Sequence, residues 1–505
     1  MTKRPNILFI MADQLAPQVL SVYGGSRVRT PHLDRLAEEG VVFENAYCNF
    51  PLCAPARFSM LSGRLPSRIG AFDNAVEFPA TTPTFHHYLR LAGYRTCLAG
   101  KMHFVGPDQL HGYEERVTTD VYPADFLWTP DWRLGDETWL EWYHDMSRVL
   151  DVGPHRRSVN VAYDDEAEFE AVRWLHEHAD ADDSRPFALT VSFISPHDPY
   201  LAPPRWWEGY GDIEIDPPRV ADIPLDARDP YSRRHWFLTG RHRAAVDESD
   251  VLRMRRAYYA LTSYIDAKVG RLLETLGEIG AAEGTLVVFT SDHGDSLGER
   301  GLFFKMSFFE WSVRVPLIVH APFAFAPRRV RANVSHLDLF PTLLEAASDG
   351  AFPDLAAPID GRSLAPLASG GGRDWPDLVC AEYTAEGVRA PLLMVRKGPH
   401  KLISSPADPP LLFDLGVDPD ERENLAGRPA FAGVRAELEA AVAGTWDVEA
   451  LDAAVRESQS ARRLVGAALD TGARTPWDYQ PMRDASRLYF REGGDIQASY
   501  SGTVR

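Results

Sequence analysis

NILFIMAD, residues 6–13, is a continuous apolar run that ends abruptly in Asp13. A strand with one solvent-facing side alternates apolar and polar residues, whereas an unbroken apolar run is typical of a strand buried on both faces. FALTVSF at 187–193 and GTLVVFTS at 284–291 have the same character. The chain therefore contains at least three strands that belong inside a covered sheet.

Amphipathic segments separate these strands along the chain, at residues 30–40, 84–93 and 258–280. In the first of them, Thr30 can cap a helix that has Pro31 at its first position and Gly40 at its end. Strands that alternate with helices build a mostly parallel sheet with helices on both faces. We expect an α/β fold in which a large, mostly parallel sheet is sandwiched by helices.

The pattern changes after residue 365, where short strands and turns are followed by a helix near 430–445. We expect a catalytic α/β domain over 1–365 and a smaller C-terminal α+β domain, a small antiparallel sheet plus helix, over 366–455. A C-terminal arm follows over 456–505. The arm stays rich in aromatic residues, which a disordered tail would hold in smaller number, so we expect it to dock on a protein surface.

Composition excludes several classes of partner. The net charge of −19 disfavours nucleic acid and anionic membranes, and four cysteines in 505 residues are too few for a disulfide scaffold. No apolar run reaches the roughly 18 residues of a membrane span, and no cleavage site follows the short run after Lys3 and Arg4. We expect a soluble, cytoplasmic protein with no nucleic-acid and no membrane partner.

Polar residues follow three of the predicted strands, as Asp13-Gln14, residues 195–198 (SPHD) and residues 292–295 (DHGD). Ligands of parallel sheets bind beyond the carboxyl ends of the strands. If these ends are neighbours, Asp13, Asp292 and His293 can share one divalent cation, and two carboxylates with an imidazole suit Mn²⁺ or Ca²⁺. Each aspartate taken alone can equally well be a helix N-cap.

The run CAPAR places Cys53 ahead of a predicted helix. Pro55 suits the first turn of that helix, and Arg57, four residues on, shares a helical face with Cys53. The helix N-terminus and the guanidinium both favour negative charge at position 53. Cys53 can be a buried thiol, a metal ligand, a nucleophile or a target of modification, and these five residues alone favour the buried thiol.

Four other polar residues have the same ambiguity. Lys101 and His103 are predicted on one side of a short strand, and Lys305 precedes an apolar stretch. Asn74 can simply cap a turn. Each of them, taken alone, is more typical of a solvated or structural residue than of a catalytic one.

Together these motifs resemble the formylglycine-dependent sulfatases of the alkaline phosphatase superfamily, from residue 5 to the C-terminus. In that family Cys-x-Pro-x-Arg signals the oxidation of the cysteine to formylglycine. Residues 106–132 and the C-terminal tail resemble the choline-sulfatase branch. The other matching positions are Asp13, the run Gly100-Lys101-Met102-His103, His197, the run Asp292-His293-Gly294, and Lys305.

The resemblance implies two cofactors. Cys53 would be converted to formylglycine by a formylglycine-generating enzyme. One divalent metal, Mn²⁺ or Ca²⁺, would be held by Asp13, Gln14, Cys53 in its converted form, Asp292 and His293. A hydroxyl of the hydrated aldehyde would then attack the sulfur of the ester, which makes the protein a sulfuric ester hydrolase.

The resemblance also implies roles for the remaining polar residues. Arg57 would stabilise the attacking oxyanion, and Lys101, Lys305 and Asn74 would hold the sulfate oxygens. His197 or Lys305 would protonate the poor alkoxide leaving group, and His103 would be the base that releases the covalent sulfate.

The choline-sulfatase branch implies choline-O-sulfate as the substrate. A quaternary ammonium cannot donate a hydrogen bond and calls for aromatic faces and carboxylates. Trp128, framed by two prolines, is the first candidate, and Asp495 in the arm is the second. We expect the arm to dock on a neighbouring subunit and so build a homodimer or homotetramer, with docking on its own subunit as the alternative.

Two departures from the family pattern keep other functions open. Many sulfatases have a second aspartate where this chain has Gln14, and Asn where it has His293. Both changes also resemble the phosphonate monoester hydrolases, so hydrolysis of phosphonate monoesters or phosphodiesters is an alternative. A non-catalytic choline-binding protein with an unconverted Cys53 is another.

Overall fold

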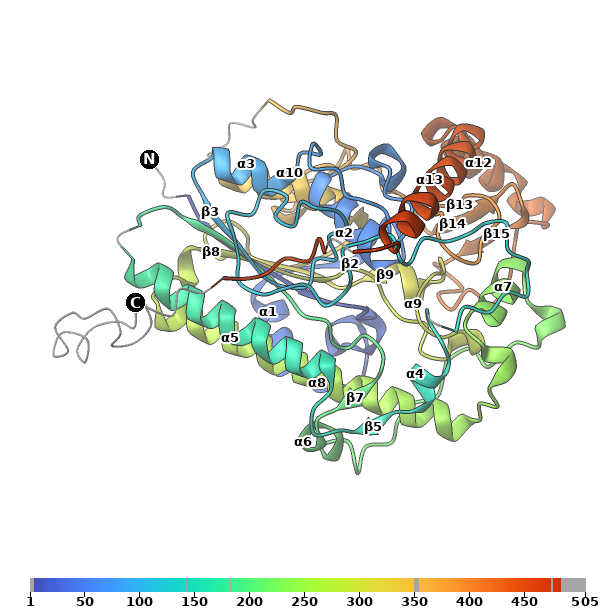
Figure 1. Ribbon diagram of the computed structural model, residues 1–505, viewed down its shortest axis with the longest axis horizontal. Coiled ribbons are helices and arrows are strands. Elements are labelled where there is room, and N and C mark those ends of the chain that lie inside the picture. The colour runs from blue at the N-terminus through green and yellow to red at the C-terminus, as the bar shows by residue number, and fades with distance from the viewer. Residues whose placement is uncertain (1–3, 142, 182, 349–353, 474–475, 483–505) are drawn as a thin grey trace.

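The computed structural model describes residues 4–141, 143–181, 183–348, 354–473 and 476–482. Within these residues, a nine-stranded sheet has the order β11-β2-β10-β8-β1-β6-β3-β4, and β9 pairs with β2 (Figure 1). β9 and β10 run antiparallel to their neighbours, and the other strands are mutually parallel. The predicted α/β fold with a mostly parallel sheet is confirmed.

The strands of this sheet are β1 Asn6–Ala12, β2 Val41–Tyr47, β3 Arg95–Gly100, β4 Glu115–Arg116, β6 Phe187–Ser192, β8 Thr285–Ser291, β9 Arg314–Val315, β10 Leu317–His320 and β11 Arg328–Ser335. The helices packed around it are α1 Pro31–Glu39, α2 Cys53–Ser62, α3 Phe85–Leu91, α4 Ser147–Leu150, α5 Val159–Asp180, α6 Pro204–Glu208, α7 Pro230–Leu238, α8 Glu248–Glu278, α9 Glu310–Val313, α10 Leu339–Ala347 and α11 Ala365–Ala368. A two-stranded sheet pairs β5 Gly153–Pro154 with β7 Leu201–Ala202.

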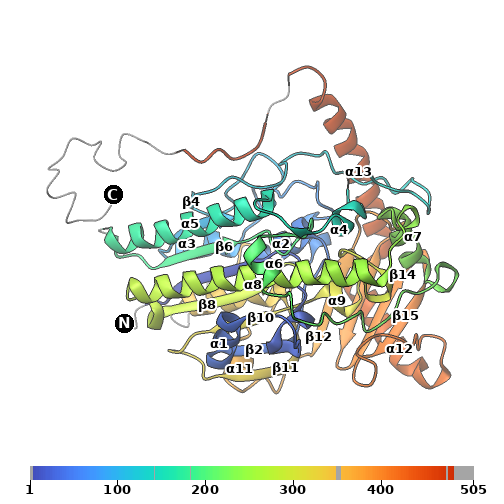
Figure 2. The same ribbon diagram turned by 90° about the horizontal axis from the view of Figure 1, so that it is seen from below.

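Helices cover both faces of the large sheet. The long helices α5 and α8 lie side by side on one face together with α1, and α2, α3 and α10 pack together on the other (Figures 1 and 2). Every residue of β1 from Ile7 to Ala12 is at most 2% exposed, as the unbroken apolar run predicts. α1 begins at Pro31 and ends before Gly40, also as predicted.

A second sheet follows the large one in the chain. It is an antiparallel meander of β12 Leu378–Tyr383, β13 Leu392–Lys397, β14 His400–Ser405 and β15 Asp408–Asp414, and α12 Ala432–Thr445 packs on β13 and β14. α13 Val448–Leu469 comes next, and Figure 1 shows it at the same end of the molecule as the second sheet. The boundary that we expected at residue 456 falls inside α13.

The described part of the arm lies on its own chain. Trp477 meets Phe126 edge to face at 5.4 Å between ring centroids, and the Tyr479 carbonyl accepts a hydrogen bond from Thr119. Residues 483–505, and with them Asp495, lie outside the described residues. The expectation that the arm reaches a neighbouring subunit therefore stays a prediction for that part.

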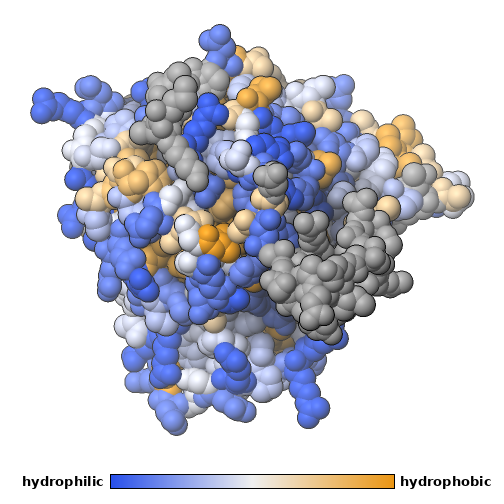
Figure 3. Space-filling model, turned by 90° about the vertical axis from the view of Figure 1, so that its left-hand side faces the viewer, coloured by the Kyte–Doolittle hydropathy of each residue, from blue (hydrophilic) through white to orange (hydrophobic). Residues whose placement is uncertain are grey.

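The surface carries mostly polar side chains on the face that Figure 3 presents, where apolar residues form separate patches among hydrophilic ones. Among the described helices, none has both the length and the apolar character needed to cross a membrane.

Candidate active site

The carboxyl ends of β8, β1, β6 and β3 lie next to one another, because these strands are consecutive in the sheet. The register pairs Ala12 with Ser291, so the residues that follow, Asp13 and Asp292, leave the sheet side by side. Lys101 comes directly after β3, and the loop after β6 carries His197. This edge of the sheet therefore gathers residues that are far apart in the sequence.

Helix α2 begins at Cys53. The preceding residue is Leu52, which has no polar side chain with which to cap the helix. Instead, the amide oxygen of Asn74 accepts a hydrogen bond from the Ala54 N–H at 2.9 Å, and the Asn74 amide nitrogen donates to the Tyr143 hydroxyl at 3.1 Å. Asn74 thus caps the helix that presents Cys53, and its proposed contact with sulfate remains a prediction.

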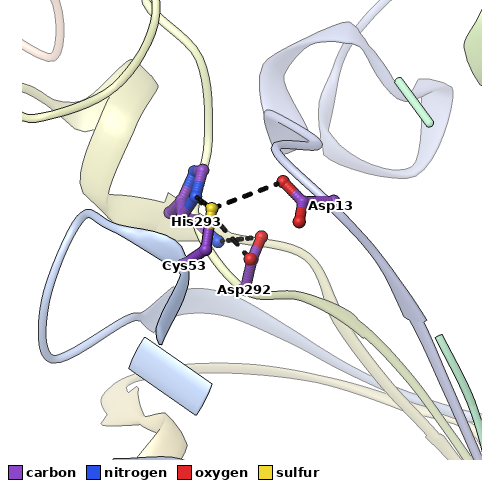
Figure 4. Close-up of side chains that lie close together, drawn as sticks. All are labelled: Asp13, Cys53, Asp292 and His293. Carbon is purple, nitrogen blue, oxygen red and sulfur yellow. Dashed lines mark hydrogen bonds and ion pairs between the residues drawn. The ribbon is translucent and has the colours of Figure 1, made fainter. Parts of the chain in front are cut away.

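Asp13, Cys53, Asp292 and His293 point toward one another (Figure 4), and one potential ligand atom from each lies within 4.8 Å of all the others. The His293 Nδ1 lies 3.0 Å from the Gly294 carbonyl oxygen, which can only accept, so Nδ1 carries the proton. Its Nε2 lone pair is left facing the Cys53 sulfur at 3.2 Å. Two carboxylates, an imidazole lone pair and residue 53 fit a divalent cation.

Arg57 forms ion pairs with both aspartates of this cluster. Its guanidinium donates to Asp292 at 3.0 Å and to Asp13 at 2.9 Å, and Lys101 pairs with the same oxygen of Asp13. Burial raises the pKa of Asp13, but Lys101, His197 and Arg57 outweigh it and hold the pKa well below its usual value. Asp13 therefore stays ionised with its charge partly compensated.

Cys53 itself is a poor nucleophile as an unmodified thiol. Burial and the negative charge of Asp13 raise the pKa of Cys53 to about 12. The reactive form of cysteine is the thiolate, which this environment disfavours at neutral pH. The geometry thus weakens the unmodified-nucleophile interpretation of the CAPAR motif.

His197 and Lys305 form a buried proton-sharing pair. The His197 Nδ1 lies 2.7 Å from the Asp198 carbonyl oxygen, which makes Nε2 the acceptor, and Nε2 lies 2.7 Å from the Lys305 ammonium. Burial lowers the pKa of His197 to about 4, so this imidazole is neutral near pH 7. The Lys305 ammonium therefore donates to the Nε2 of His197.

The side chain of Gln14 lies between the cluster and Lys305. Its amide oxygen accepts from Lys305 at 2.6 Å, and its amide nitrogen donates to Asp295 at 2.5 Å. The backbone N–H of Gln14 donates to Asp292 at 3.0 Å. Gln14 borders the predicted metal site, and its role as a ligand stays a prediction.

His103 lies in a loop, because β3 ends at Gly100. The prediction that Lys101 and His103 share one side of a strand is therefore wrong. Asp120 accepts from the backbone N–H groups of Met102 and His103 and turns the chain there. Burial and Lys101 hold the pKa of His103 well below its usual value, and neither ring nitrogen has a hydrogen-bond partner among the described residues. The ring is a neutral, unpaired base.

Aromatic rings line the site next to Lys101. The half-buried Trp128 meets Tyr122 at 5.0 Å and His103 at 5.8 Å between ring centroids, both edge to face. The Lys101 ammonium lies 4.3 Å from the Tyr122 ring centroid, and Tyr143 lies 6.3 Å from Trp128. Trp128, chosen from the sequence, thus belongs to a group of aromatic residues beside the Cys53 cluster.

Glu386, on the loop between β12 and β13, is a residue that the sequence reasoning missed. It is 2% exposed, and within the described structure no hydrogen bond of good geometry reaches either carboxylate oxygen. Burial and the negative charge of Asp73 raise its pKa to about 8, although the nearby Tyr143 hydroxyl lowers it somewhat. Its local sequence, TAEGV, is ordinary, so only the fold identifies it as a buried acid near the site.

Comparison with known proteins agrees with this geometry. The sulfatase family model matches residues 5–349. Models described as "N-sulphoglucosamine sulphohydrolase, C-terminal" and "Choline sulfatase enzyme C terminal" match residues 298–446 and 453–498. The chain therefore belongs to the sulfatase family. It is 46% identical, over 97% of its length and 96% of the relative, to a protein of Rhizobium meliloti (strain 1021) named choline-sulfatase.

Solved structures share the fold at lower identity. One is the phosphonate monoester hydrolase of Agrobacterium radiobacter, with a TM-score of 0.68 and 24% identity over 87% of this chain and 95% of that one. Another was solved with its substrate D-glucosamine-2-N,6-O-disulfate and has a TM-score of 0.71 and 24% identity over 88% and 97%. At this identity the likeness supports the α/β sulfatase fold alone.

Proposed function

We propose that this protein is a choline sulfatase, which hydrolyses choline-O-sulfate to choline and sulfate. The observation that carries the proposal is Glu386, a buried carboxylate next to the hydroxyl of Tyr143, which belongs to the aromatic group of Trp128, Tyr122 and Tyr143. An ammonium without hydrogen-bond donors is held by aromatic faces and a negative charge. The identity with the Rhizobium choline-sulfatase supports the same substrate.

In this proposal, two groups that the sequence does not encode complete the site. Formylglycine made from Cys53 supplies, as its hydrate, the hydroxyl that attacks sulfur, and a divalent metal lowers the pKa of that hydroxyl. Asp13, Asp292 and His293 would hold the metal, with Gln14 as a further ligand. Mn²⁺ and Ca²⁺ both fit this mixed set of donors.

The residues of the chain would act around this centre. Arg57 holds Asp13 and Asp292 in place, since both are ion-paired to its guanidinium. The sulfate oxygens would be bound by Lys101 and Lys305. As the S–O bond to the choline oxygen breaks, Lys305 would donate its proton to that oxygen, with neutral His197 as its hydrogen-bond partner. His103, neutral and unpaired, would accept the proton that the release of sulfate requires.

The cell biology of the protein is also part of the proposal. A formylglycine-generating enzyme would modify Cys53, and the mature protein would act in the cytoplasm. Residues 483–505 would dock on a neighbouring subunit of a homodimer or homotetramer, where Asp495 would meet the substrate cation.

Steady-state kinetics on three substrates test the proposal. We expect kcat/KM for choline-O-sulfate to exceed the values for 4-nitrophenyl sulfate and for a phenyl phosphonate monoester. A preference for the phosphonate would instead support the phosphonate hydrolase alternative. Binding of choline with no turnover of any ester would support the non-catalytic alternative.

A further inference from the structure

Helix α13 holds a buried ion pair that the proposed mechanism does not use. Arg462 donates to both carboxylate oxygens of Asp73, at 2.7 and 2.6 Å, and the two side chains are 8% and 0% exposed. Asp73 also accepts from the Ala75 N–H at 2.9 Å, which fixes the turn that carries Asn74. A bidentate, desolvated arginine–carboxylate pair sets position as well as charge.

The same face of α13 holds the loop that carries Trp128. The Arg462 guanidinium lies 3.3 Å from the Thr129 hydroxyl oxygen, and the Gln459 amide oxygen accepts from the Trp132 N–H at 3.1 Å. Both contacts are buried or partly buried, and both lie on the residues that directly follow Trp128. Helix α13 therefore helps to hold Trp128 in place, in addition to the local hydrogen bonds between Thr129 and Phe126.

The contacts continue to the segment of Glu386. The Trp132 indole N–H donates to the Ala385 carbonyl at 2.8 Å, one residue before Glu386. Arg456 of α13 donates to the Arg389 carbonyl on the same loop at 2.6 Å. Three separate segments, which carry Asn74, Trp128 and Glu386, thus meet on one helix.

We infer that α13 assembles the choline pocket from these three segments and that Arg462 is its main positioning residue. The inference rests on the proposed function, and it adds a determinant of specificity outside the reacting centre. Arg462 contacts none of the residues that hold the metal, which are tied together by Arg57 instead. The choline sulfatase C-terminal model also begins at residue 453, within α13, whereas the general sulfatase match ends at 349.

Loss of Arg462 would leave the carboxylate of Asp73 buried and unpaired, which is strongly unfavourable, so the turn at 73–75 and the Trp128 loop would shift. The test is Arg462→Gln, with Arg435→Gln as the matched control. Arg435 lies on α12 and pairs with Glu439 of the same helix, and both side chains are partly exposed. The probe is choline, as a competitive inhibitor of 4-nitrophenyl sulfate hydrolysis.

For Arg462→Gln we expect the inhibition constant of choline to rise about 10-fold or more. We expect kcat/KM for 4-nitrophenyl sulfate to fall by a clearly smaller factor, because the shifted turn also carries Asn74, which caps the helix that presents Cys53. Arg435→Gln should change neither value more than about 2-fold. If Arg462→Gln does not fold, Arg462→Lys replaces it. Lysine keeps the charge without the bidentate geometry, so the same selective loss is expected at a smaller size.

An unchanged inhibition constant in a folded Arg462 variant, or equal losses on both measurements, would overturn the inference and leave the proposed function standing. If choline does not inhibit the wild-type protein, and the wild-type protein does not hydrolyse choline-O-sulfate, the proposed function fails and the inference fails with it.

Discussion

Choline should bind more tightly as the pH rises, and Glu386→Gln should remove this dependence. The pKa of Glu386 is raised to about 8 by burial and by Asp73, so its carboxyl is mostly protonated in the free site at pH 7. The ammonium favours the carboxylate, so choline binding releases a proton. The dissociation constant of choline should therefore rise as the pH falls through 8, by about 10-fold at pH 7 and about 100-fold at pH 6 relative to its high-pH limit.

The assay is inhibition of 4-nitrophenyl sulfate hydrolysis by choline between about pH 6 and pH 9. The aryl ester carries no cation and does not depend on Glu386. The pH profile of its own kcat/KM therefore reports the titrations of the reacting centre, separately from the titration of Glu386. Glu137→Gln is the matched control, because Glu137 is exposed and pairs with Arg233 at the surface. An inhibition constant that stays level across this range, or the same slope in Glu386→Gln, would refute the reasoning.

The remaining predictions concern the nucleophile, the metal, the aromatic wall and the arm. The tryptic peptide that contains Cys53 should weigh less than the thiol form, and an unmodified peptide from active protein would contradict formylglycine. Asp292→Ala should lose its metal in elemental analysis, and full occupancy would remove Asp292 from the metal site. Trp128→Ala should cost about 0.5–2 kcal/mol in kcat/KM for choline-O-sulfate and less for 4-nitrophenyl sulfate; equal costs would mean that Trp128 only packs. Deleting residues 477–505 should lower the mass seen by light scattering and raise KM for choline-O-sulfate, and no change in either would exclude the proposed role of the arm.

Local sequence patterns were enough to predict those elements whose structure depends on a single segment of the chain. The apolar run at 6–12 predicted a fully buried strand, because a strand covered by helices on both sides needs no polar alternation. Proline and glycine marked the ends of α1, because Pro31 suits the first helical position and a Cβ at Gly40 would come within 2.7 Å of the Leu36 carbonyl oxygen. The same reasoning was wrong at Lys101 and His103, where Asp120, 17 residues away from His103, bends the chain out of the strand.

The sequence by itself determined which segments form the buried strands and where the polar strand ends lie. Through its resemblance to the sulfatase signal, the CAPAR motif also predicted that Cys53 belongs to the reacting centre. Only the tertiary structure decided that Glu386 is a buried acid, that His197 is a neutral acceptor for Lys305, and that Arg462 pairs with Asp73 across 389 positions of the chain. The physical reason is that burial and the neighbouring charges determine the protonation and the role of a polar side chain. Those neighbours come from distant segments that only the fold brings together.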